Sequence, residues 1–250
     1  MRTSPTVSVV IPYGPKFTPN SMLERAKQSA KAQQIPVEII VVTDDQSHGP
    51  AWARNRGLEQ AETRYVAFLD ADDRWNEDKL KRQLDRMDST GAGLCVEAPD
   101  ISKKTFMCEL YLGNIESLTS SILIDTEQIA IRFDEVLERR EDHLFILEAA
   151  AAGDICTCED LFEVERHGES LSSGMTHTYR LKKDKEFAIK VKQQVPEVRE
   201  YINEEYRYVA CDGRPFMNTA GDVYRALLLG VSYYTLANIF VSFLCQKLLK

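Results

Sequence analysis

Short apolar runs alternate with helical patterns along the first hundred residues, and this alternation constrains the fold more than any other feature. The runs at 7–11, 37–43 and 65–69 are rich in Val, Ile and Leu and carry few charges, as buried parallel strands do. Helical patterns of about 10–15 residues separate them, which is the spacing of βαβ units. The sequence therefore predicts an α/β fold with a mainly parallel sheet flanked by helices.

The same alternation continues further along the chain and weakens in two places. The stretch from 95 to 118 has no clear period and is expected to be irregular or to carry strands of a mixed sheet. Residues 180–208 are highly charged and are expected to be largely helical. Other helices are expected at 21–33, 51–61, 77–89 and 142–152, and other strands at 93–98, 121–125 and 155–165.

Acidic residues follow the second and third expected strands directly. Asp44 and Asp45 follow the second strand, and Asp70, Asp72 and Asp73 follow the third. The carboxyl ends of parallel strands meet at one edge of a sheet, which is where ligands bind in such folds. Crowded acids raise each other's pKa, so a cation or a polar ligand is expected among them. The alternative is a group of acids favoured by the dipole of the following helix.

The balance of charge restricts the partners. The chain has 31 Lys and Arg against 39 Asp and Glu, a net charge of −8, so it carries no general basic surface for nucleic acid. The six cysteines lack zinc-finger spacing and are expected to be reduced, mostly buried thiols. No secretory signal precedes the first strand, so the protein is expected in the cytoplasm or at the cytoplasmic face of the membrane.

Residues 226–245 form a stretch without a single charge. The stretch is long enough to cross a bilayer, but its Tyr, Ser, Thr and Asn residues make it less apolar than a typical span. Two interpretations remain open, a membrane-embedded or interfacial helix and a helix buried in the protein or in a dimer interface. The first predicts membrane contact through a C-terminal helix, and the second is compatible with a homo-oligomer.

Several motifs in one order resemble those of a family 2 glycosyltransferase. They are VSVVIP, VEIIVVTDDQS, ARNRGLEQA, YVAFLDADDRWNEDKL, FDE at 133–135, the Glu141–Asp142 pair and RHGESLS. The resemblance covers residues 7–172 and implies the GT-A fold, with a Rossmann-like nucleotide-binding sheet that is mixed and mainly parallel. It also implies that a sugar passes from a nucleoside diphosphate donor to an acceptor hydroxyl with inversion of configuration.

The resemblance implies roles in donor binding for four matched positions and a supporting role for a fifth. Pro12 and Tyr13 would line the nucleotide base. Asp45 would accept a hydrogen bond from a uracil-type ring, which makes UDP-sugars the favoured donors, and Asp44 would hold the loop. Arg54 would lie near the base or the diphosphate.

The acids after the third strand would bind ribose and metal. Asp70 and Asp72 would contact the donor and the metal, and Asp73 is a further metal ligand; the sequence does not divide these roles among the three. Mg²⁺ or Mn²⁺ held by one or two carboxylates neutralises the charge that develops on a departing diphosphate.

Asp142 would be the general base that removes the proton of the acceptor hydroxyl. An in-line displacement needs a base opposite the leaving diphosphate, and a carboxylate on a different segment from the metal site can occupy that face. The alternative is an ordinary acidic first turn of a helix. Arg166 and His167 are further donor-binding candidates that would stabilise the departing diphosphate, or else are surface or packed residues.

The chain departs from the family pattern at three places. Tyr13-Gly14-Pro15 stands where Thr-Tyr-Asn is usual, Gln46 stands where Gly is usual, and His143 stands where an aromatic residue is common. The base contacts of the first loop and the identity of the acceptor therefore do not carry over from the resemblance.

Other functional classes fit less well. Receiver domains and phosphatases need acids after the first strand, which ends here without one, and a nucleotidyltransferase needs a Gly-rich basic loop there. The remaining alternative is a catalytically inactive GT-A-fold nucleotide-sugar-binding or scaffold protein, against which the intact Asp72, Asp73 and Asp142 argue.

The expected organisation has three parts. A GT-A catalytic domain occupies 1–172, a charged helical extension 173–222, and a hydrophobic C-terminal helix 223–250. The expected enzyme is a metal-dependent, hexosyltransferase-type glycosyltransferase. Its partners would be a nucleotide-sugar donor and a sugar, lipid-linked or protein-linked acceptor, in the assembly of a polysaccharide, a glycolipid or a glycoprotein glycan.

Overall fold

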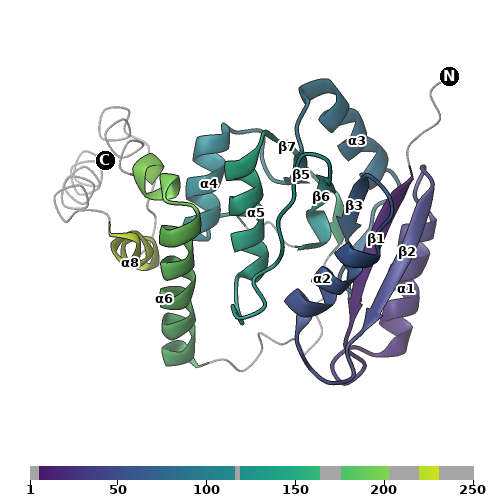
Figure 1. Cartoon of the computed structure of the whole chain (residues 1–250), viewed down its shortest axis with the longest axis horizontal. Helices are drawn as coiled ribbons and strands as arrows, with labels where there is room; N and C mark the ends of the chain where they lie inside the picture. Colours follow the sequence, from purple (N-terminus) through teal and green to yellow (C-terminus); the bar gives the residue numbers. More distant parts are fainter. Residues whose placement is uncertain (1–5, 116–118, 164–175, 203–219, 231–250) are drawn as a thin grey trace, which may run out of the picture.

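The computed structural model describes residues 6–115, 119–163, 176–202 and 220–230 (Figure 1). Its main sheet has six strands in the order β2-β1-β3-β6-β5-β7. All neighbours pair in parallel except β6, which runs antiparallel to both β3 and β5, so the expected mixed, mainly parallel α/β sheet is confirmed. The strands are β1 (Val7–Tyr13), β2 (Val37–Thr43), β3 (Tyr65–Phe68), β5 (Leu94–Glu97), β6 (Leu123–Asp125) and β7 (Ile155–Cys158).

Helices cover both faces of this sheet. One face packs on α1 (Asn20–Lys31) and α3 (Lys79–Thr90), and the other packs on α2 (Pro50–Gln60), α4 (Lys103–Leu112) and α5 (Glu141–Ala152). Successive strand residues point to opposite faces, and both faces are covered by helices, so most strands carry apolar residues at successive positions rather than only at alternate ones. Both ends of each element lie within two residues of the expected positions, with two exceptions. Helix α4 was not expected, and β7 ends earlier than expected.

The first strand continues through Pro12, although we expected it to end there. Pro12 pairs with Val42 of β2, while the pairing of β1 with β3 stops at Val10 and Phe68. Val10 accepts a hydrogen bond from Leu69, so even-numbered residues of β1 face β3. Proline lacks an N–H, and at position 12 that missing donor faces the side where β3 has already ended.

Helix α2 approaches the sheet closely because Gly57 has no side chain. A Cβ at position 57 would lie 2.1 Å from Cγ1 of Val10. Glycine is unfavourable in a helix interior, so its presence in the ARNRG motif is explained by this close contact with β1.

Replacing Gly57 by alanine is expected to lower the free energy of unfolding by about 1–3 kcal/mol, because the added methyl group overpacks the core. Gly153→Ala is the matched control, since φ at Gly153 is −156° and its added Cβ would lie 3.5 Å from Ile129. Urea unfolding of both variants tests this. A Gly57→Ala protein as stable as the wild type would contradict the close contact.

Two features of the fold differ from the expectation. Helix α4 occupies part of the stretch that we expected to be irregular or stranded, and the expected strand at 155–165 is broken by a turn at 159–161. Asp160 in that turn has φ of 53°. The chain then forms β8 (Phe162–Glu163), which pairs with β4 (Arg74–Trp75) in a separate two-stranded sheet.

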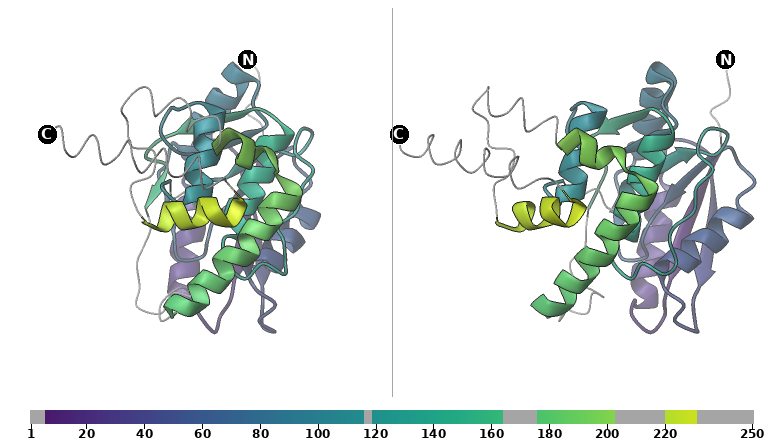
Figure 2. Two further views of the ribbon diagram at one scale, coloured as in Figure 1. Left: turned by 90° about the vertical axis from the view of Figure 1, so that its left-hand side faces the viewer. Right: turned by 60° about the vertical axis from the view of Figure 1, so that its left-hand side comes forward.

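The described C-terminal helices pack on the face of α4 and α5 that is turned away from the sheet (Figure 1). They are α6 (His177–Gln194) and α8 (Ala220–Leu229), and α8 lies across α6 (Figure 2). Phe187 and Val191 of α6 and Leu229 of α8 belong to the same buried cluster as α4 and α5. The division of the chain at residues 172 and 222 stays a prediction.

The expected hydrophobic helix at 226–245 falls largely outside the described residues, which include only 226–230 of it. Within the described ranges, no helix combines the length and the apolar character that crossing a membrane requires.

Candidate active site

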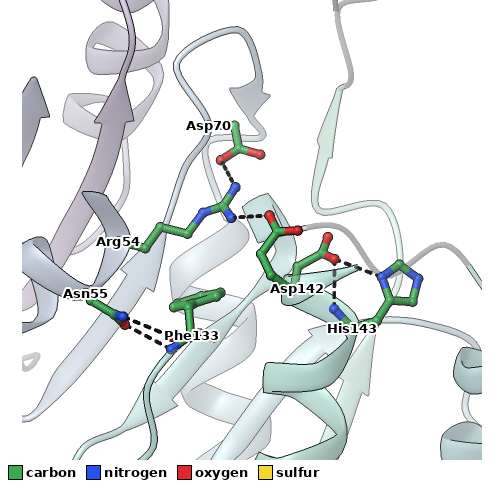
Figure 3. Close-up of polar contacts among 7 residues, drawn as sticks. Arg54, Asn55, Asp70, Phe133, Asp142 and His143 are labelled. Atoms are coloured by element: carbon green, nitrogen blue, oxygen red, sulfur yellow. Dashed lines mark hydrogen bonds and ion pairs between the residues drawn. The ribbon is translucent and has the colours of Figure 1, made fainter. Parts of the chain in front are cut away.

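Arg54 connects two acids that lie far apart in the sequence. Its guanidinium donates from Nη2 to Oδ1 of Asp70, at the end of β3, and from Nη1 to Oε1 of Glu141, at the start of α5, both at 2.9 Å (Figure 3). Arg54 itself is only 4% exposed. Burial opposes its charge, but Asp70 and Glu141 outweigh burial and raise the pKa of Arg54. The pairing thus holds a permanent cation between the two segments.

One atom of Arg54 is not used by these ion pairs. Nε is buried and has no hydrogen-bond partner among the described residues. A buried donor without a partner costs free energy, and Nε of Arg56 and of Arg86 share this state among the described residues. The permanent charge of Arg54, rather than this atom, is what suits the residue to an anionic ligand.

Asn55, the next residue of α2, fixes the segment that leads to α5. Its side-chain amide donates to the carbonyl of Phe133 and accepts from the Phe133 N–H, both at 2.9 Å (Figure 3). It also donates to Glu135 at 2.8 Å. The Phe133 ring stacks on Phe145 of α5 with centroids 4.1 Å apart. The ARNRG motif thereby holds both the FDE segment and the Glu141–Asp142 pair.

Ser120 organises the acids that follow β3. Its hydroxyl accepts from the Asp70 N–H at 3.0 Å and donates to Oδ2 of Asp73 at 2.5 Å. Trp75 donates from its indole to the Ser120 carbonyl at 2.8 Å. Burial, followed by the charge of Asp70, raises the pKa of Asp73 to about 7, and the bond from Ser120 offsets this only in part.

The candidate metal ligands differ in their surroundings. Asp72 is half-buried, whereas Asp73 is buried and bonded to Ser120. Nowhere in the described ranges do three or more His, Cys, Asp or Glu side chains gather as they would to hold a metal ion. Mg²⁺ and Mn²⁺ at a diphosphate need only one or two protein carboxylates, because phosphate oxygens supply further ligands. Asp72 fits this arrangement better than Asp73.

Asp142 and His143 form a pair at the first turn of α5. Oδ1 of Asp142 accepts from the His143 backbone N–H at 2.8 Å and lies 2.9 Å from Nδ1 of its ring (Figure 3). Burial opposes ionisation of Asp142, but the charge and bonds of His143 and the charge of Arg54 outweigh burial and lower the pKa to about 2. Both contacts with His143 use Oδ1 of Asp142. Neither occupies Oδ2, which can therefore accept a proton.

Removing the His143 ring is expected to raise the pKa of Asp142 by roughly one unit, because an opposite charge and a hydrogen bond to the carboxylate are lost together. His143→Phe tests this by a carboxyl ¹³C NMR titration. His48→Phe is the control, because His48 makes a similar contact with a different acid, Asp44, at 3.0 Å. The titration of Asp142 should therefore stay the same in His48→Phe. An unchanged Asp142 titration in His143→Phe would refute the role of the ring.

The loops after β1 and β2 carry the remaining described candidates. Asp44 accepts from the Gly49 N–H at 2.8 Å and so holds the loop that begins α2. Asp45 is exposed in that loop. Pro12 and Tyr13 end β1 beside the end of β2. The carboxyl ends of three parallel strands, β1, β2 and β3, thus reach one edge of the sheet, as expected of a parallel arrangement.

The structure brings some of the candidates together. Arg54 contacts Asp70, and its second partner is the neighbour of Asp142. Arg166 and His167 lie outside the described residues. Sequence reasoning missed Glu141 as the partner of Arg54 and missed Ser120 altogether. Glu141 stood within a recognised motif, whereas no sequence signal marked Ser120.

Comparison with known proteins shows which sequences this chain resembles. Residues 19–142 match the sequence model described as glycosyl transferase family 2. The succinoglycan biosynthesis protein ExoO of Rhizobium meliloti (strain 1021) is 29% identical over 187 residues, which cover 54% of this chain and 53% of ExoO. The chain thus spans about half the length of that curated relative.

Solved structures of glycosyltransferases share the fold. TarS of S. aureus (residues 1–349), in complex with UDP-GlcNAc, aligns with a TM-score of 0.59 at 18% identity, covering 95% of this chain and 81% of that one. The mannosyltransferase PcManGT from Pyrobaculum calidifontis, in complex with GDP-Man and Mn²⁺, aligns with a TM-score of 0.56 at 14% identity, covering 98% and 75%. The GT-A fold expected from the sequence is therefore confirmed.

Proposed function

Since the chain belongs to glycosyl transferase family 2, we propose that it moves a sugar from a nucleoside diphosphate donor, with UDP-sugars favoured, to an acceptor hydroxyl with inversion of configuration. The observation that carries this proposal is the pairing of Arg54 with both Asp70 and Glu141. It places the end of β3, where the donor would bind, next to the start of α5, where the base would lie.

Each residue then has a role that follows from its chemistry. Arg54, which is permanently charged, orients the donor near its diphosphate. Asp70 and Asp45 accept hydrogen bonds from ribose and base. Asp142 accepts the proton of the acceptor hydroxyl on Oδ2 as that oxygen attacks the anomeric carbon and the diphosphate departs from the opposite face.

A divalent metal completes the proposal. Mg²⁺ or Mn²⁺, when bound, neutralises the charge that develops on the departing diphosphate. Asp72 would hold it, with Asp73 as a second ligand once its carboxylate turns from Ser120. The Mn²⁺ in the PcManGT complex, a protein of the same fold, supports a divalent metal, and the choice of Asp72 and Asp73 rests on this chain's own residues.

The acceptor is proposed from the relatives alone. The name of ExoO refers to succinoglycan, a polysaccharide. We propose that this chain also acts in polysaccharide assembly, on a sugar or lipid-linked sugar at the cytoplasmic face of the membrane.

A thermal-shift panel tests the donor class. UDP, GDP, TDP and CDP are each added with and without Mn²⁺ or Mg²⁺. A ligand at a hundred times its Kd stabilises by about 2.7 kcal/mol, which for a chain of this size is a rise in Tm of roughly 5–10 °C. We expect this rise with UDP in the presence of metal.

The same panel on Asp72→Ala is expected to show no metal-dependent rise. Asp88→Ala is its control, because Asp88 is an exposed acid on α3 away from the end of β3. A wild-type protein that responds to none of the nucleotides would favour the inactive scaffold over the enzyme.

A further inference from the structure

The chain enters the acid pair of α5 through a residue with an unusual backbone conformation. Arg140, the N-cap of α5, has φ of 64° and ψ of 25°, in the left-handed region that favours glycine. Its side chain makes no capping hydrogen bond, and a guanidinium has no acceptor with which to make one. Glu141 and Asp142 follow it directly in the first turn of the helix. The local sequence therefore does not explain why α5 begins here, and contacts with the rest of the fold must hold this conformation in place.

The side chain of Arg140 is bound to the end of α4. Its Nη2 donates to the carbonyls of Leu110 and Tyr111, at 2.8 and 2.7 Å. These carbonyls belong to the last turn of α4, where the helix dipole and the free backbone acceptors favour a cation. Arg140 is only 9% exposed, and burial lowers its pKa to about 10, so the guanidinium still carries its charge at neutral pH.

The same guanidinium lies over an aromatic ring of α6. Its Cζ is 4.0 Å from the centroid of the Phe187 ring, and that ring stacks on Tyr111 of α4 with centroids 5.6 Å apart. A cation removed from water and placed over an aromatic face makes a favourable contact. Arg140 thus connects the start of α5 with both α4 and α6, which lie beside it in Figure 1.

Helix α6 also binds the residues that lead to Arg140. Three partly exposed ion pairs join α6 to residues 134–140, and their members are Arg139 with Asp184 at 2.7 Å, Glu138 with Lys183 at 3.0 Å, and Asp134 with Lys190. Each such pair contributes little by itself. Together they keep this segment against α6 along its length, between Phe133, which Asn55 holds, and Arg140.

The two acids after Arg140 are held in different ways. Glu141 has an ion pair with Arg54 of α2. The hydrogen bonds described for Asp142 run to His143, its own neighbour, which moves with the same turn of helix. The place of the Asp142 carboxylate relative to the donor site therefore depends on how the backbone is held at the start of α5.

We propose that Arg140, held by Phe187 of α6, is a positioning residue that sets the place of Asp142 for sugar transfer. This rests on the proposed function, in which Asp142 takes the proton of the acceptor hydroxyl. Displacing a catalytic group by about 1 Å can cost about 10²-fold in rate, so the anchor of its helix matters. Helix α6 begins at His177, beyond the residues 19–142 that match the family model, and it thereby becomes part of the catalytic arrangement.

Hydrogen exchange of the full chain, followed by NMR, tests the anchor without depending on transfer. The Leu144 amide donates to the Arg140 carbonyl at 3.0 Å, and the Gly153 amide donates to Ala149 at the other end of α5 at 3.1 Å. Glycine adopts the φ of position 140 without strain, so Arg140→Gly removes the side-chain contacts alone. In this variant we expect the Leu144 amide to exchange about tenfold faster and the Gly153 amide at the wild-type rate. Phe187→Leu, which removes the ring and keeps an apolar side chain, should act on Leu144 in the same direction.

A kinetic test compares the rate of transfer with the affinity for the nucleotide. Release of UDP from UDP-glucose or UDP-GlcNAc, with membrane lipid extract as acceptor, gives the rate, and calorimetry with UDP and Mn²⁺ gives the affinity. At saturating donor we expect transfer to fall by about 10–10²-fold in Arg140→Gly and about tenfold in Phe187→Leu, with a smaller loss of affinity. Ile189→Ala is the matched control, because Ile189 lies on α6 and is 53% exposed, so both values should stay unchanged.

The outcomes separate this proposal from the proposed function. A residue that only stabilises the fold would leave the rate per folded molecule unchanged, and circular dichroism gives the folded fraction of each variant. Unchanged exchange at Leu144, an unchanged rate at saturating donor, or a loss of UDP affinity as large as the loss of rate would overturn the role of Arg140 alone, provided that the wild type is active. A wild type that binds UDP but transfers no sugar would overturn the proposed function and this role together.

Discussion

Replacing Arg54 by methionine is expected to lower the free energy of unfolding by about 3–5 kcal/mol, the cost typical of removing one partner of a buried ion pair. Arg54 is nearly buried, and the side chains of Asp70 and Glu141 are 29% and 13% exposed. Without the guanidinium, two largely buried carboxylates face each other across the junction of β3 and α5. Burial already raises the pKa of Glu141, and the loss of Arg54 raises it further.

Urea unfolding of Arg54→Met at pH 7 provides the measurement, and Arg56→Met is its matched control. Arg56 lies on the same helix, is 42% exposed and pairs with Glu59 on the surface, so its loss is expected to cost at most about 1 kcal/mol. Arg54→Lys should rescue only part of the stability, since an ammonium cannot present the two parallel donors of a guanidinium. If Arg54→Met and Arg56→Met lowered the free energy of unfolding by the same amount, the ion pairs of Arg54 with Asp70 and Glu141 would not be what holds the site together.

The pH dependence of the Arg54→Met effect follows from the sign of the Glu141 shift. A carboxyl whose pKa is raised on folding destabilises the protein above that pKa and ceases to do so once it is protonated. The deficit of the variant relative to the wild type should therefore shrink as the pH falls from neutrality toward the pKa of an ordinary glutamate, about 4.3. If the loss of stability in Arg54→Met grew as the pH fell through this range, the unpaired acids would not be its cause.

The strands could be predicted because burial leaves a direct mark on sequence. β1 and β3 are mostly buried, and the edge strand β2 is partly buried, so runs composed largely of apolar residues record that environment in all three. Helix α4 could not be predicted in the same way. Six of its ten residues are buried, including Phe106 to Cys108 in succession, so it shows no helical period, and only its caps at Ser102 and Gly113 mark it.

The candidate residues could be named from the sequence, but the contacts among them could not. Asp70 and Asp142 follow from motifs, and Arg54 from its place in ARNRG. The pairing of Arg54 with Glu141 joins residues 87 positions apart and depends on how α2 and α5 pack. Ser120 carries no charge and belongs to no motif; it acts because a short 3₁₀ turn places its hydroxyl between Asp70 and Asp73. Such roles arise from the tertiary structure alone.

The Asp142→Asn variant is expected to transfer sugar about 10²–10⁴-fold more slowly than the wild type, the usual worth of a positioned general base. Asparagine keeps the shape of the side chain and an oxygen that can accept from the His143 N–H. It cannot take up a proton at Oδ2. The affinity for the nucleotide, measured by calorimetry, should change little, because donor binding is proposed for residues on other segments.

Glu141→Gln separates this role from that of its neighbour. Glu141 is bonded to Arg54, whereas Asp142 is bonded to His143, so the two adjacent acids serve different partners. The Gln variant loses an ion pair and is expected to lose stability and nucleotide affinity, with a smaller loss in the rate of transfer at saturating donor. Release of nucleoside diphosphate, with membrane lipid extract or free saccharides as acceptor, gives both rates. If Asp142→Asn transfers within tenfold of the wild type while Glu141→Gln does not, the base is Glu141, and Arg54 rather than His143 is the residue that sets its protonation.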